Sequence, residues 1–166
     1  MATAKSAVPA GFHTVTPHLI LDDTAEAIAW YAAALGAEEV APRALGPDGR
    51  VMHAEIRIGN SVLMLNDAMG GGRSAKALGG SPIGLWIYVD DCDALYRRAV
   101  AAGAQVPPGP MGVLGDQFWG DRTGTVSDPF GYMWTIATRK EDLTSAEMAE
   151  RFDAFVKQIA CQPATA

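Results

Sequence analysis

The sequence contains one succession of features twice. Each copy has an apolar segment, two consecutive aspartates, an alanine-rich amphipathic segment, a glycine and a second extended segment. The first copy runs from Leu21 to Val40 and the second from Val89 to Val106. This order predicts a strand, a capped helix, a glycine stop and a new strand. Two copies indicate a duplicated supersecondary module rather than a solenoid of many repeats.

Hydrophobic periodicity extends both copies to the order strand, helix, strand, strand, strand. In the first module it predicts strands at 14–21, 38–44, 51–58 and 61–66, and a helix between Asp23 and Gly36. In the second it predicts strands at 83–89, from 105, at 117–125 and at 132–138, and a helix at about 91–102. The predicted fold is therefore α+β, with two βαβββ modules.

Five segments follow from this pattern. They are an N-terminal arm at 1–13, the first module at 14–66, a glycine-rich linker at 67–82, the second module at 83–140, and a C-terminal helix and tail at 141–166. Thr144 and Glu147 form a capping box for the last helix. Its apolar face carries Met148, Phe152, Phe155 and Ile159. Such a face needs a surface to cover, in its own domain or in a second subunit.

Composition limits the partners. The chain has 166 residues, 49% of them apolar, and a net charge of −6. Its basic residues form no stripe, which argues against a nucleic-acid partner, and no apolar run approaches the length of a membrane helix. No signal peptide is recognised. Cys92 and Cys161 are read as reduced thiols, so the expected location is cytoplasmic.

Three segments carry a resemblance to a known family. They are Gly49–Ile56, Asp116–Arg122 and Asp128–Trp134. Together with the paired modules, they resemble the vicinal oxygen chelate superfamily, in its glyoxalase/bleomycin-resistance-like, PhnB-like branch. The resemblance covers about residues 14–140 and implies curved mixed sheets around a cavity, with the C-terminal helix as an addition. It also implies a homodimer, in which modules pair within or between chains.

The resemblance further implies where a divalent metal would be held. Metal-dependent members place His, Glu or Gln ligands on the first and fourth strands of each module. The corresponding positions here are Thr16, Met64, Gly84 and Thr135. None offers an imidazole or a carboxylate, which such a site needs. No cofactor is therefore expected.

The remaining residues of the expected concave face suggest a pocket for a small, aromatic or apolar molecule. The candidate cavity residues are His18, Met64, Trp86, Tyr88, Gln117, Trp119 and Thr135. For the three aromatic residues, ordinary core packing is the competing interpretation. Asp121 and Arg122 are expected to form a structural ion pair at a turn.

Two other functions stay open at this point. A metal site relocated to His18, His53 and Glu55 would make the chain a metal-dependent lyase, isomerase or dioxygenase. Alternatively, tryptophans fill the cavity, and the chain is a structural or interaction protein. The sequence does not decide whether the chain is an enzyme.

Overall fold

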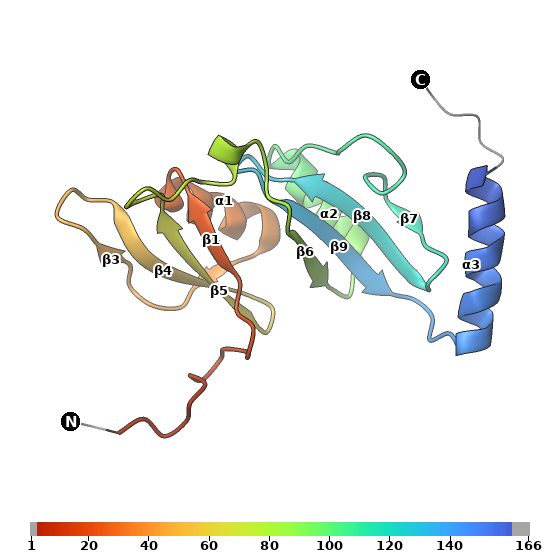
Figure 1. Cartoon of the computed structure of the whole chain (residues 1–166), viewed down its shortest axis with the longest axis horizontal. Coiled ribbons are helices and arrows are strands. Elements are labelled where there is room, and N and C mark those ends of the chain that lie inside the picture. Colours follow the sequence, from red (N-terminus) through yellow and green to blue (C-terminus); the bar gives the residue numbers. More distant parts are fainter. Residues whose placement is uncertain (1–2, 161–166) are drawn as a thin grey trace.

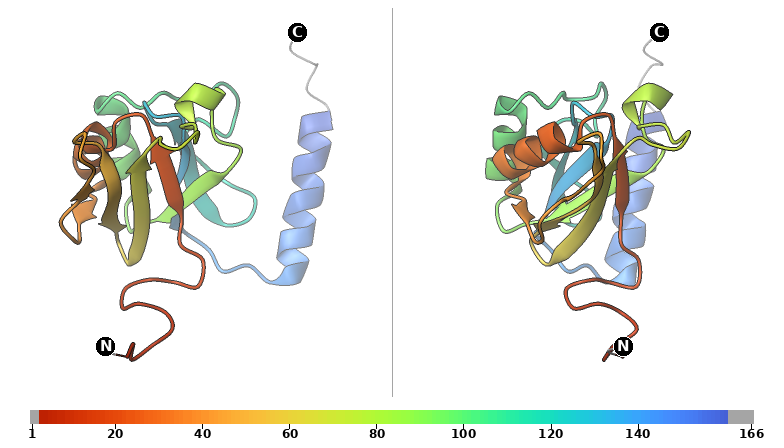
Figure 2. Two further views of the ribbon diagram at one scale, coloured as in Figure 1. Left: turned by 60° about the vertical axis from the view of Figure 1, so that its left-hand side comes forward. Right: turned by 90° about the vertical axis from the view of Figure 1, so that its left-hand side faces the viewer.

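The computed structural model describes residues 3–160 and shows two sheets side by side (Figure 1). Helices α1 (Thr24–Leu35) and α2 (Cys92–Ala101) lie together on one side of the sheets (Figure 2). A third helix, α3 (Ser145–Ala160), stands beyond the second sheet, on the side opposite α1 and α2. The two sheets therefore have helix-covered faces on one side and open faces on the other.

The two modules have the same topology. The first contains β1 (His18–Leu21), β2 (Glu38–Glu39), β3 (Ala44–Leu45), β4 (Val51–Ile58) and β5 (Ser61–Asp67), in the order β1-β5-β4-β2, with β3 on β4. The second contains β6 (Gly84–Tyr88), β7 (Gly115–Asp116), β8 (Asp121–Ser127) and β9 (Met133–Arg139), in the order β6-β9-β8-β7. In each sheet the first strand pairs in parallel with the last. The predicted duplication and fold class are confirmed.

Capping explains where the two module helices begin and end. The side chain of Asp23 accepts a hydrogen bond from the Glu26 amide at 2.9 Å, and Asp91 accepts one from the Ala94 amide at 2.9 Å. Each bond satisfies an amide that the first turn of a helix leaves free. Gly36 ends α1 with φ at 73°, a conformation that favours glycine.

The modules are joined by buried polar contacts as well as by apolar packing. Asp128, in the turn before β9, accepts hydrogen bonds from the Tyr31 hydroxyl of α1 and from the Trp134 indole, both at 2.8 Å. Burial, reinforced by the Asp128 charge, raises the pKa of Tyr31, so its hydroxyl stays protonated and donates. Trp30 donates to the Ala102 carbonyl at 2.8 Å, which ties α1 to the end of α2. The two modules therefore share one core.

Several predicted strand boundaries are wrong. Residues 14–17 are not part of β1, residues 40–43 are irregular, and Gln105 makes only an isolated bridge to Ser127. The strand predicted at 117–125 begins at Asp121, because residues 117–120 form the turn after β7. In that turn Gly120 has φ at 90°, and a Cβ there would lie 2.7 Å from the Glu141 carbonyl oxygen. Glycine is therefore required where the alternation of residues suggested a strand.

The first residues of β4 depart from strand alternation. Regular alternation predicts Met52 on the same face as Ala54, Ile56 and Ile58, but Val51 is buried and Met52 is 53% exposed. The pairing of β3 with β4 shifts between Ala44 and Leu45, which rotates this end of β4. From Ala54 onward the predicted alternation is confirmed, since Ala54, Ile56 and Ile58 are buried.

The C-terminal helix begins as predicted. The Thr144 amide donates to the Glu147 carboxylate at 2.8 Å, and the Glu147 amide donates back to Thr144 Oγ1 at 3.3 Å. No residue of α3 is buried. Cys92 is a buried free thiol at the start of α2, and Cys161 lies outside the described residues. Among residues 3–160, no helix is both long and apolar enough to cross a membrane.

Candidate functional site

Strand alternation gives each module a face that points away from α1 and α2. We call these the first open face and the second open face. The first carries His18, His53, Glu55, Arg57, Met64 and Asn66. The second carries Trp86, Tyr88, Thr125, Thr135 and Arg139.

On the first open face, the polar groups form two separate pairs. His18 shares a hydrogen bond with the Asn66 side chain, and His53 Nε2 lies 2.9 Å from Glu55 Oε1. In the sheet register, Met64 lies between His18 on β1 and Glu55 on β4. Because neighbouring strands are about 4.8 Å apart, this places the His18 and Glu55 backbones about 10 Å apart. The relocated metal site would need His18, His53 and Glu55 to point at one centre. In the structure, His18 pairs with Asn66, and His53 pairs with Glu55.

The four positions at which the resemblance places a metal do not fit a divalent ion. Thr16 donates to the His13 carbonyl at 3.0 Å, and Thr135 Oγ1 is paired with Thr125 Oγ1 at 2.9 Å. Met64 offers a thioether and Gly84 no side chain. Within residues 3–160, no three His, Cys, Asp or Glu side chains are grouped so that they could hold a metal ion. We therefore assign no reaction step to a metal.

The second open face is aromatic. The ring centroids of Trp86 and Tyr88 are 6.3 Å apart with planes inclined by 29°, and Trp119 lies 6.4 Å from Trp86. Trp86 is 47% exposed and Tyr88 59% exposed. Interpreting these two residues as ordinary core is therefore wrong. Rings of this size are normally buried in a core or an interface, so their joint exposure needs an explanation.

One buried carboxylate holds two of these three rings. Asp121 is 1% exposed, and its Oδ2 accepts from the Tyr88 hydroxyl at 2.8 Å and from the Trp119 indole at 3.0 Å. Its Oδ1 accepts from Arg139 at 3.1 Å. The hydrogen bond to Asp121 raises the pKa of Tyr88 and keeps the hydroxyl a donor at neutral pH. Tyr88 and Trp119 are thus oriented before any ligand arrives.

The expected ion pair between Asp121 and Arg122 is absent. Successive residues of a strand point to opposite faces, so these two side chains diverge. Arg122 instead contacts Asp93 of α2 at 2.6 and 2.9 Å, which lowers the pKa of Asp93 to about 2. Asp121 pairs with Arg139.

A groove of about 700 Å³ runs along β6, between the two modules. Trp86 and Tyr88 line it from the second module, and the turn joining β4 to β5 lines it from the first. His13, Val15 and Pro17 of the N-terminal segment complete its wall. The sequence offered no reason to select His13, Val15 and Pro17. The groove forms beside β6 because that strand is at the edge of its sheet.

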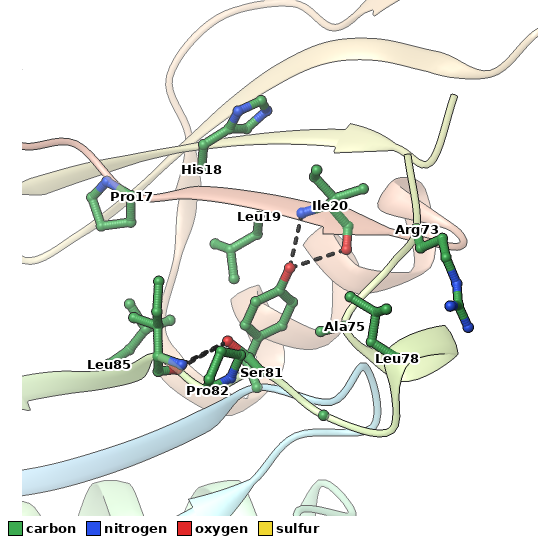
Figure 3. Close-up of a pocket in the computed structure, with 13 residues that line it drawn as sticks. Pro17, His18, Leu19, Ile20, Arg73, Ala75, Leu78, Ser81, Pro82 and Leu85 are labelled. Carbon is green, nitrogen blue, oxygen red and sulfur yellow. Dashed lines mark hydrogen bonds between the residues drawn. The ribbon is translucent and has the colours of Figure 1, made fainter. Parts of the chain in front are cut away.

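A second cavity of about 250 Å³ lies between β1 and the segment that connects the modules (Figure 3). Leu19, Leu78 and Leu85 make most of its surface apolar, and His18 lies at its wall. Across it the Tyr132 hydroxyl donates to the Ile20 carbonyl at 3.0 Å and lies 2.9 Å from the Ile20 amide. These bonds tie the second module to β1.

The predicted cavity residues thus fall in different places. Trp86, Tyr88 and Trp119 are brought together, whereas His18 lines the smaller cavity. Met64 and Thr135 lie mid-strand on the two open faces. Gln117 donates to the Gly115 carbonyl at 3.2 Å within the turn after β7. Phe118, beside Trp119, was not among the predicted residues, although it is part of the same aromatic run in the sequence.

Two βαβββ modules with paired helices on one side and open sheet faces on the other define a class of small α+β proteins built by duplication. The profile of the Glyoxalase/Bleomycin resistance protein/Dioxygenase superfamily matches residues 11–136. The chain belongs to that superfamily, as the resemblance implied.

Known proteins agree with this assignment. An uncharacterized protein of Mycobacterium bovis is 42% identical over 139 residues, which are 81% of this chain and 88% of that protein. TioX from Micromonospora sp. ML1 has a similar structure, with a TM-score of 0.58 and 24% identity over 80% of this chain and all of TioX. A bleomycin-binding protein crystallised with bleomycin has a TM-score of 0.52 and 20% identity over 78% of this chain and 99% of that one. A PhnB protein from Bacillus cereus, described as a putative 3-demethylubiquinone-9 3-methyltransferase, has a TM-score of 0.56 and 17% identity over 76% of this chain and 99% of that one.

Proposed function

We propose that the protein binds a small aromatic or apolar molecule against the second open face, without a metal ion. The observation that carries this proposal is a cluster of three rings: Tyr88 and Trp119 are held by Asp121, Trp86 contacts both, and Trp86 and Tyr88 are exposed beside the groove. A binding site of this kind combines apolar surface with a few polar groups that orient it.

Preorganised side chains favour binding at this site. A ligand that stacks on Trp86 and Tyr88 removes apolar surface from water, and each aromatic contact adds about 0.5–1.5 kcal/mol beyond that burial. Because Asp121 already holds the Tyr88 and Trp119 side chains, binding costs little additional side-chain entropy.

The similarity to a protein crystallised with bleomycin supports a binding role, although it extends only to the fold. The polar pairs of the first open face give no comparable support to metal chemistry, since Met64 separates them. A filled cavity is not favoured either, because Trp86 and Tyr88 are exposed. The proposed location of the protein is cytoplasmic.

The proposal includes a homodimer. The second open face exposes the apolar rings of Trp86 and Tyr88 in the single chain, and exposed apolar surface of this kind is typical of interfaces and ligand sites. In the dimer, the first open face of one protomer covers the second open face of its partner and closes the site. Light scattering on the full chain should give twice the mass of the monomer.

Binding is tested by titrating the protein with indole in a calorimeter. Trp86→Ala should weaken binding about three- to tenfold, the equivalent of one lost aromatic contact. Leu45→Ala is the matched control, because Leu45 is an exposed apolar residue outside the groove. Equal affinity in the Trp86 variant and the wild type would refute the site.

Elemental analysis of protein purified without chelators tests the metal-free part of the proposal. We expect no stoichiometric transition metal. A full equivalent of zinc, nickel, iron or manganese, lost in a His53→Ala variant, would favour the relocated site instead. Native mass spectrometry of the same sample shows whether an apolar molecule co-purifies.

A further inference from the structure

The aromatic cluster of the second open face continues to the C-terminal helix. The ring centroid of Phe118 lies 4.9 Å from that of Trp119. It also lies 4.9 Å from the ring centroid of Phe155, with planes inclined by 29°, and 5.5 Å from that of Phe152. Six rings, from Tyr88 and Trp86 through Trp119 and Phe118 to Phe152 and Phe155, thus form one contiguous series. We call this series the aromatic ladder.

The outer end of the ladder is held in place by the backbone. The Gly120 carbonyl accepts hydrogen bonds from the Lys140 amide at 2.9 Å and from the Glu141 amide at 3.0 Å. The side chain of Arg151 in α3 reaches back to Glu141. Because the segment before α3 is fixed to the turn that carries Phe118, the helix and this ring are positioned together.

This junction forms a shallow, open cleft of about 440 Å³. Its walls are Phe118, Leu143, Thr144, Ser145, Met148, Ala149 and Phe152. Phe152 nevertheless remains 49% exposed, and no residue of α3 is buried. The cleft is thus lined by two phenylalanines and the adaptable thioether of Met148, which favours contact with aromatic rings.

Charge restricts what the cleft can take. The whole chain carries a net charge of −6, and residues 139–157 around the cleft contain five carboxylates and four basic side chains. An anionic ligand would therefore meet a net negative charge, whereas a neutral or cationic one would not be repelled.

We propose that α3 and Phe118 form an outer subsite, which takes the planar fused-ring portion of a neutral or cationic ligand. The inference rests on the proposed function, because the outer subsite continues the aromatic surface of the second open face. The ligand would be elongated: one part contacts Trp86 and Tyr88, and a fused aromatic part lies in the cleft, against Phe118 and Phe152.

The outer subsite is tested with 9-aminoacridine, a cation with three fused rings. Phe152→Ala and Phe118→Leu should each weaken its binding about three- to tenfold, as expected for one aromatic contact. Alanine is the best helix former, so the first variant should keep α3 intact, which circular dichroism can verify. Val156→Ala is the matched control, because Val156 is an exposed apolar residue of α3 outside the cleft and the ladder. It should bind the probe like the wild type.

Indole separates this inference from the proposed function. Indole binding that depends on Trp86, with acridine binding that is insensitive to Phe152 and Phe118, would overturn the outer subsite alone. Failure of both probes to bind the wild type would overturn both proposals. If Phe152→Ala changes the mass measured by light scattering and leaves acridine affinity unchanged, α3 is an interface helix and the outer subsite is wrong.

Discussion

The two modules share a topology and differ in what that topology presents. The row His18–Met64–Glu55 crosses β1, β5 and β4, and the row Trp86–Thr135–Thr125 crosses β6, β9 and β8. The first row has an imidazole and a carboxylate at its ends, whereas the second has an indole and a hydroxyl. The same order of the four main strands thus supports a polar open face in one module and an aromatic one in the other.

The helix-covered faces differ as well. Six residues of α1 are buried, but only Cys92 and Ala99 of α2 are. Phe130 and Trp134 of the second module pack against Tyr31 of α1, which helps to bury this helix. The second module therefore contributes Phe130 and Trp134 to the core that it shares with the first. The two copies therefore share a strand order but differ in role. The helix of the first is the more deeply buried, and the second carries the exposed aromatic face.

The largest expected effect is a difference in unfolding free energy between two tryptophan variants of the second module. Trp134 is 2% exposed and lies in the shared core, so Trp134→Ala should cost about 3–5 kcal/mol of unfolding free energy. Trp86→Ala, on the open face, should cost less than about 1 kcal/mol. Urea denaturation of both variants measures the difference. Similar losses would contradict the division of roles.

A second test concerns the carboxylate that joins the modules. Asp128 accepts four hydrogen bonds: Oδ2 from Tyr31 and Trp134, and Oδ1 from the Phe130 and Tyr132 amides. In Asp128→Asn, the NH₂ group of the new side chain would face two of these donors in either orientation. The lost hydrogen bonds should cost about 1–3 kcal/mol of unfolding free energy. Tyr31→Phe removes only one donor and should cost less in the same denaturation assay. A larger loss for Tyr31→Phe would mean that packing, not the carboxylate, joins the modules.

The two helix caps should be equivalent, in contrast to the faces. Asp23→Ala and Asp91→Ala each remove one side-chain bond to a first-turn amide at the same distance of 2.9 Å. Each should therefore cost about 1 kcal/mol of unfolding free energy. Thermal denaturation of the two single variants compares them directly. Losses that differ severalfold would show that the modules are not equivalent even at their caps.

The smallest effect is expected from acid. The hydrogen bonds and charge of Arg122 lower the pKa of Asp93 to about 2, so the ionised form is stabilised by folding. This contribution is complete above about pH 4 and is lost as the pH falls through the folded value. Arg122→Met should make the decline of stability between about pH 4 and 2 shallower, whereas Arg50→Met, at the exposed pair with Asp48, should change it less. Urea midpoints across this range provide the measurement, and parallel curves for the Arg122 variant and the wild type would contradict the assignment.

Local rules predicted the fold because the relevant residues interact within a few positions. Asp23, Asp91 and Thr144 cap helices whose first turns immediately follow them. Leu19 and Leu21 alternate with His18 and Ile20 on a strand with one buried face. Such patterns are visible in the sequence without knowledge of the tertiary structure.

The candidate site was only partly predictable because its geometry depends on distant segments. Trp86 and Tyr88 share a face by alternation, and the sequence shows this. Their connection to Trp119 through Asp121 depends on a turn that the strand pattern concealed. The groove depends on the space between two strand edges that do not pair, which no local pattern indicates.

Gly120 has a consequence for how this chain can change over time. Its carbonyl binds both Lys140 and Glu141, and its missing side chain leaves room for the Glu141 backbone. The position at which the C-terminal extension leaves the second module is therefore set by a residue of that module. Another terminal sequence fused after Glu141 should leave the sheet at the same place, so the extension could be replaced without moving its first residues.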